Sequence, residues 1–171
     1  EACPRLLRTL TARFDLVITT TDLGDMDHLE LARRIRAAGH KAHLVLLTFE
    51  NRGLGEALTS ASLPGIDRVY VWQGDRRILL GIISQIEDQL NVRRDTDRVG
   101  VSSIILIEDS PRYYSSFLPL LYTELLKQSR NVIAEGTNLE NKLMRMQARP
   151  KILLCTDYEQ ALRAYRAYRS F

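Results

Sequence analysis

Five short apolar runs alternate along the chain with stretches in which apolar residues recur every three or four positions. Short runs rich in Val, Ile and Leu are typical of strands buried on both faces of a parallel sheet. The amphipathic stretches between them predict helices that pack on such a sheet. The alternation therefore predicts an α/β fold. The expected strands are residues 15–20, 43–48, 68–72, 103–108 and 151–156.

Helices are expected at residues 26–38, 75–89 and 158–168, and a short one around Leu6, Leu7 and Leu10. The longest helical region, Pro111 to Gln147, contains Pro119 and the sequence Gly136-Thr137-Asn138. Because proline and glycine disfavour a helix interior, these positions are expected to interrupt it. The prediction is an elongated helix or a helical hairpin between two strands.

A polar segment divides the chain into two parts of unlike character. Residues 91–100, NVRRDTDRVG, are charged and lack any apolar period, which is typical of a linker. The predicted organisation is a first part at residues 1–91, a linker at residues 92–100 and a second part at residues 101–171. A chain of 171 residues has room for one large domain or two incomplete ones.

Composition narrows the class of protein. Hydrophobic residues make up 45% and charged residues 26%, as in globular proteins. The net charge of +3 is spread along the chain, so we expect no nucleic-acid partner. Cys3 and Cys155 lie far apart without metal-ligand spacing, so neither a zinc site nor a disulfide framework is indicated. No apolar run reaches the length of a membrane span, and we expect no membrane partner and a cytoplasmic location. Because the chain begins at Glu1, we interpret it as a piece of a longer protein.

The strongest chemical signal is an apolar strand that ends in two carboxylates, Glu108 and Asp109. Ligands of doubly wound sheets bind at the carboxyl ends of strands. Two carboxylates there are weak candidate ligands for Mg²⁺, which prefers oxygen donors, and no other cofactor is expected. The alternative is that Asp109 or Ser110 caps the helix that follows.

A second signal lies at residues 14–27, FDLVITTTDLGDMD. This segment resembles the third strand and following loop of response regulator receiver domains. Thr20 stands where such domains carry the aspartate that accepts phosphate. The resemblance implies that the acceptor carboxylate is missing, because a hydroxyl cannot form the acyl phosphate of the receiver switch.

The resemblance to receiver domains continues in the next two strands. Thr48, at the end of residues 44–48, matches the switch Ser/Thr of the fourth strand. Trp72-Gln73 stands where the fifth strand carries a Lys-Pro pair, so the cation that would pair with an aspartyl phosphate is also absent. This implies a pseudo-receiver whose degenerate site comprises Thr20, Thr48, Trp72, Glu108 and Asp109, with no catalytic residue.

After the predicted linker the receiver pattern begins again. Residues 104–111 resemble the first receiver strand with its acidic pair, and residues 151–161 resemble the second strand and the helix after it. The implied fold is a doubly wound, flavodoxin-like parallel sheet of five strands in the order 2-1-3-4-5, supplied in permuted order and with an elongated helical insertion. Either the two parts combine into one sheet, or they exchange with a second copy.

Taken over nearly its whole length, the chain is similar to bacterial proteins with tandem receiver-like domains before a phosphoenolpyruvate-synthase-like, PEP/pyruvate-binding region. The similarity implies a noncatalytic signalling module of a larger phosphotransfer protein, and not an enzyme. The alternative is a Mg²⁺-dependent phosphoacceptor domain. The expected partners are other domains of the same protein and a second copy bound through the region from Pro111 to Gln147.

Overall fold

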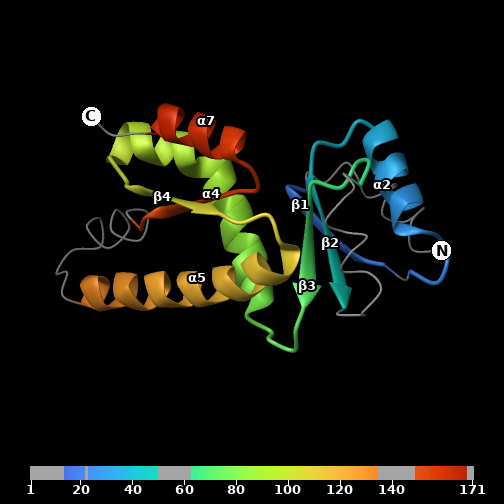
Figure 1. The fold of residues 1–171 in the computed structure, drawn as a ribbon, viewed down its shortest axis with the longest axis horizontal. Helices are drawn as coiled ribbons and strands as arrows, with labels where there is room; N and C mark the ends of the chain where they lie inside the picture. The colour runs from blue at the N-terminus through green and yellow to red at the C-terminus, as the bar shows by residue number, and fades with distance from the viewer. Residues whose placement is uncertain (1–13, 22, 50–62, 135–148, 169–171) are drawn as a thin grey trace. The chain divides into compact units, whose positions relative to one another are not determined.

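The computed structural model describes residues 14–21, 23–49, 63–134 and 149–168 of the chain (Figure 1). These residues belong to two units, residues 1–74 and residues 75–171. Both units combine parallel strands with helices, which confirms the α/β class. Within the described ranges, no helix is long and apolar enough to cross a membrane.

The first unit contains a three-stranded parallel sheet in the order β1-β2-β3. Its strands are β1 (Leu16–Thr20), β2 (His43–Phe49) and β3 (Arg68–Trp72), each within one residue of the range expected from its apolar run. Helix α2 (His28–Ala37) packs on the sheet through Leu31, Ala32 and Ile35, which form a core with Leu44 of β2. The apolar side of the helix thus packs against the face of the sheet that carries Leu44.

Local chemistry explains where α2 begins and how its end is held. The side chain of Asp27 accepts a hydrogen bond from the Leu29 N–H at 3.2 Å, which caps the first turn. Near the other end, Arg36 donates to the carbonyls of Ala42 at 2.8 Å and Gly65 at 3.1 Å, and pairs with Asp67. The guanidinium therefore ties the helix to the segments that lead into β2 and β3.

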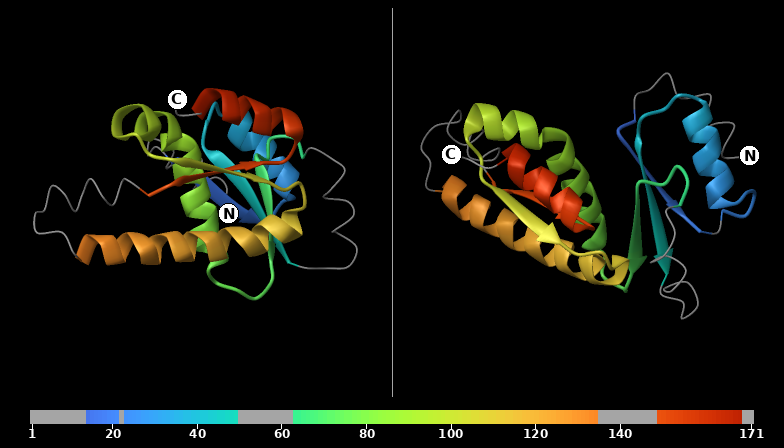
Figure 2. Two further views of the ribbon diagram at one scale, coloured as in Figure 1. Left: turned by 60° about the vertical axis from the view of Figure 1, so that its left-hand side comes forward. Right: turned by 45° about the horizontal axis from the view of Figure 1, so that its top comes forward.

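The second unit contains α4 (Ile78–Val99), β4 (Ser103–Ile107), α5 (Pro111–Ala134), β5 (Lys151–Cys155) and α7 (Tyr158–Tyr168). Strands β4 and β5 pair in parallel, with Ser103 opposite Lys151 and Ile107 opposite Cys155. Figure 2 shows α5 and α7 on opposite faces of this two-stranded sheet. Helix α4 packs against both α5 and β5.

Helix α5 corrects one expectation from the sequence, because it runs unbroken through Pro119. A proline inside a helix costs about 3 kcal/mol or more, since it removes one hydrogen bond and crowds the preceding turn. Packing offsets this cost, because Leu118 and Tyr122 are fully buried beside it. Gly81 of α4 faces the proline ring, and a Cβ at that position would lie 3.2 Å from ring atoms. The bend expected at Gly136 lies outside the described residues, as does the short helix around Leu6.

The segment predicted as a linker is also different from expectation. Residues 92–99 complete helix α4, which ends at Gly100 in the left-handed conformation with φ of 68°. Although this segment is mostly charged, two of its residues, Val92 and Asp95, are buried. The buried Asp95 has an ion-pair partner, Lys151, at the start of β5. The described strands form sheets of three and two, so the predicted order of five strands remains a proposal.

Candidate functional site

Three of the predicted site residues lie at the carboxyl ends of adjacent parallel strands in the first unit. Thr20 is the last residue of β1 and Trp72 the last of β3, whereas Thr48 is the residue before the end of β2. Register pairs Thr20 with Leu47, Thr48 with Val71 and Phe49 with Trp72. The three residues therefore lie at the carboxyl ends of the three strands, where α/β folds bind ligands.

Their side chains do not converge on one point, because successive residues of a strand alternate between faces. Thr20 lies in register with Leu47, so Thr20 and Trp72 fall on one face, with β2 between them. Thr48 falls on the opposite face, the one that carries Leu44 and packs on α2. The sheet therefore separates the hydroxyl of Thr48 from the other two side chains.

The hydroxyl of Thr48 is also occupied. The residue is 2% exposed, and its Oγ1 donates to the carbonyl oxygen of Phe49 at 3.3 Å. Trp72 is half-buried, and Phe49 beside it is 57% exposed. This edge of the sheet thus presents aromatic surface, which suits contact with another apolar group.

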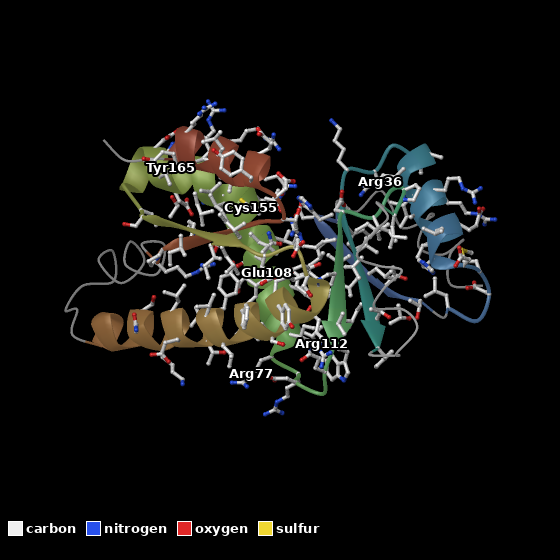
Figure 3. The ribbon with its side chains drawn as sticks, in the orientation of Figure 1. Arg36, Arg77, Glu108, Arg112, Cys155 and Tyr165 are labelled. Atoms are coloured by element: carbon white, nitrogen blue, oxygen red, sulfur yellow. The ribbon has the colours of Figure 1, made fainter. Side chains whose placement is uncertain are left out.

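The two predicted carboxylates lie in the second unit, where the chain leaves β4 and enters α5 (Figure 3). The N–H of Glu108 donates to the carbonyl of Cys155 at 3.0 Å, which extends the pairing of β4 with β5 by one residue. The carboxylate of Glu108 accepts a hydrogen bond from the Ser110 N–H at 3.0 Å. This contact orders the turn before α5, and it is made by Glu108 and not by Asp109 or Ser110, the two residues predicted as a possible cap.

Asp109 is exposed to solvent, whereas Glu108 is half-buried. In the parts of the chain that the structure describes, no three His, Cys, Asp or Glu side chains gather as a metal site would require. Any Mg²⁺ bound here would take two carboxylates at most and would keep several of its waters.

The main charged cluster of the second unit was not predicted from the sequence. Asp88 of α4 is completely buried, and its Oδ2 accepts hydrogen bonds from Tyr122 Oη at 2.9 Å, Arg149 Nη1 at 2.9 Å and the Ile152 N–H at 2.8 Å. Arg149 Nη2 lies 2.7 Å from Oδ1 of Asp88, and Lys151 Nζ lies 3.8 Å from the same oxygen. The guanidinium of Arg149 therefore hydrogen-bonds to Oδ2 and lies within ion-pair distance of Oδ1.

A second aspartate two turns further along α4 completes the cluster. Asp95 Oδ2 lies 2.8 Å from Lys151 Nζ, and Asp95 Oδ1 lies 3.3 Å from Arg94 Nε. Burial opposes the ionisation of Asp95, but the hydrogen bonds and charges of Lys151 and Arg94 outweigh burial and hold its pKa below the usual value. Arg149 also lies over the ring of Tyr122, at 5.4 Å from the ring centre.

Signals for this cluster exist in the sequence. Asp88 and Asp95 are seven residues apart on a helix and share a side with Val92, while Arg149 and Lys151 occupy alternate positions at the start of a strand. With both carboxylates paired to buried cations, the cluster is suited to fixing a helix on a strand.

Comparisons of the chain with protein-family models, with curated proteins and with solved structures find no match.

Proposed function

We propose that the chain is a noncatalytic, receiver-like signalling module that regulates a larger phosphotransfer protein. The observation that carries the proposal is the arrangement of β1, β2 and β3 as consecutive parallel neighbours whose ends bear Thr20, Thr48 and Trp72. This agrees with strands 3, 4 and 5 of a receiver. In that assignment Thr20 replaces the acceptor carboxylate, and Trp72 replaces the lysine.

The second unit supports the same assignment. Strands β4 and β5 pair directly and in parallel, as strands 1 and 2 of a receiver do, and Glu108 and Asp109 follow β4. In the proposed five-stranded sheet the order is β5-β4-β1-β2-β3, which equals 2-1-3-4-5.

The strand edges favour this joining of the sheets. Strand β4 has the apolar sequence SIILI, typical of a central strand, yet Ile104 and Ile107 are 40% and 59% exposed. Ile18 of β1 is 37% exposed. Among the described strands, β1 pairs only with β2, and β4 pairs only with β5, so one edge of each remains open. Open apolar edges favour strand addition, and pairing β4 with β1 would close both.

Solution scattering combined with a mass measurement tests the proposed sheet. A compact monomer supports joining of β4 to β1 within one chain. An obligate dimer with exchanged halves would show instead that each sheet is completed by a second copy.

Phosphorylation is tested separately. After incubation with acetyl phosphate and Mg²⁺, intact-mass analysis is expected to show no acyl phosphate, because Thr20 offers no carboxylate. A matched variant, Thr20→Asp combined with Trp72→Lys, restores both groups and serves as the positive comparison. A phosphoaspartyl adduct on the unaltered chain would overturn the pseudo-receiver assignment in favour of the Mg²⁺-dependent phosphoacceptor, with Glu108 and Asp109 as the metal ligands.

We further propose that α5 contacts a partner domain or a second copy. Four apolar side chains of α5 are exposed along one side of the helix: Tyr113 at 55%, Phe117 at 42%, Leu120 at 52% and Leu121 at 39%. The rings of Tyr113 and Phe117 are stacked, with centres 6.3 Å apart. A stripe of this width normally packs against another element. Residues 135–147, which belong to the same predicted surface, lie outside the described residues.

A further inference from the structure

Helix α4 occupies the outer edge of β5. Strand β5 bonds to β4 through alternate residues, because the Lys151 N–H donates to Ser102 at 2.9 Å and the Cys155 carbonyl accepts from Glu108 at 3.0 Å. In a parallel ladder the residues between them direct their backbone groups away from that neighbour. One of these groups, the Ile152 N–H, donates to the Asp88 carboxylate of α4 at 2.8 Å. Asp88 thus takes the position where a further strand would place a carbonyl.

Buried charges hold this contact in place. Asp88 is 0% exposed, and Arg149 and Lys151 are each less than a tenth exposed. Arg149 binds both oxygens of Asp88, and Lys151 bridges Asp88 to Asp95. Two aspartates against one arginine and one lysine give no net charge. Because the two anions belong to α4 and the two buried cations lie at the start of β5, α4 cannot move off β5 without separating the buried charges.

At the opposite edge of the same sheet, no strand among the described residues pairs with β4. Two of the three isoleucines of β4, Ile104 and Ile107, are exposed. The unit therefore combines one edge closed by a carboxylate with one open edge. An apolar residue in place of Asp88 would also cover β5, but it would leave the buried Ile152 N–H without an acceptor, which costs about 1–3 kcal/mol.

We propose that Asp88, Arg149, Lys151 and Asp95 form an edge lock, a conformational device that keeps α4 on β5 and prevents a strand from adding there. Strand addition is confined to β4 while the lock is closed. Release of α4 frees the Ile152 N–H and opens β5 to the edge strand of a second copy of the chain. This inference does not depend on the receiver assignment, because it rests only on contacts within the second unit.

Amide hydrogen exchange of the full chain, measured by NMR, tests the lock. The variant Asp88→Leu/Arg149→Met removes the acceptor and the buried cation together, so no unpaired charge remains between them. Exchange at Ile152 is expected to rise at least about tenfold, because a hydrogen bond to a carboxylate is lost. Exchange at Leu153, whose N–H faces β4, is the internal control and is expected to remain unchanged. Asp97→Asn is the matched control, since Asp97 is exposed and pairs with the exposed Arg93 on the same helix.

Sedimentation of the same variants over a range of concentrations gives the second readout. The double variant is expected to associate more strongly than the unaltered chain and the Asp97→Asn control. Unchanged exchange at Ile152, an equal rise at Leu153, or unchanged association would overturn the proposal. Should the double variant fail to fold, the unaltered chain itself tests the lock, because an Ile152 N–H that exchanges as fast as an amide without a hydrogen bond would equally refute it.

Discussion

The buried pair of Asp88 and Arg149 gives the sharpest prediction about stability. Removing either partner alone leaves the other charge in a site that excludes water, and such losses cost about 3–5 kcal/mol. Asp88→Leu leaves Arg149, which is less than a tenth exposed, without its carboxylate partner. It also removes the acceptor of the hydrogen bonds from Tyr122 and Ile152. Arg149→Met removes the closest cation from Asp88. The remaining cation is then Lys151, whose Nζ lies 3.8 Å from Asp88 Oδ1. Each single variant is therefore expected to destabilise the second unit by about 3–5 kcal/mol.

The double variant is expected to cost less than the sum of the single ones. With both charges removed, what remains is the loss of acceptors for Tyr122 and Ile152, about 1–3 kcal/mol for each group left without one. The resulting coupling energy is expected to exceed about 2 kcal/mol, whereas distant sites add to within about 0.5 kcal/mol. Urea unfolding at pH 7 measures the coupling energy. NMR signals of the second unit are used to follow unfolding, because a chain with two units need not unfold in a single step. Additive costs would refute the view that the pair is desolvated as one unit.

Further variants probe the two units separately. Folding lowers the pKa of Asp95, so the stability that its carboxylate contributes is present above its unfolded pKa and is lost as pH falls through its folded pKa. Asp95→Asn is therefore expected to lower the unfolding free energy at pH 7 and to make that free energy fall less steeply in acid. An equally steep fall of the unfolding free energy in acid would contradict this. Gly81→Leu places a side chain against Pro119 and is expected to lower the unfolding free energy, measured with urea, by about 1–3 kcal/mol. An unchanged unfolding free energy would show that α4 can shift on α5 to make room. Arg36→Met removes donors from the carbonyls of Ala42 and Gly65 and is expected to destabilise the first unit by about 1–3 kcal/mol; equal stability would show that these contacts are exchanged for water without loss. Phe117→Ser on the exposed side of α5 is expected to weaken self-association measured by sedimentation while leaving the unfolding free energy nearly unchanged, and an unaltered association constant would remove α5 from the interface.

Elements whose signals are local were predictable from the sequence. Each strand is a short apolar run, and the structure places all five within one residue of expectation. Helix α7 spans residues 158–168 as predicted, because its apolar period and its start after Asp157 lie in the same few residues. The α/β class, which was predicted from the alternation of strand and helix patterns, is therefore confirmed for the described residues.

Features that depend on distant residues were not predictable in the same way. The second half of α4 is polar, and the partner of its buried Asp95 is Lys151, which lies 56 positions further along the sequence. The continuity of α5 through Pro119 depends on the absence of a side chain at Gly81 on another helix. For the candidate site, the strand ends were located correctly in sequence, but the facing of Thr48 depends on register. Register is set between strands, so it is not encoded in one strand alone.

The charges on α4 also determine where the chain can be divided. Arg149 and Lys151 are buried beside β5, and their counter-ions come from residues 88 and 95. A shorter fragment that starts at residue 101, just after the polar segment, would keep both cations and lose both anions. Such a truncation is expected to aggregate or to be degraded during expression, whereas one that starts at residue 75 retains a neutral interior.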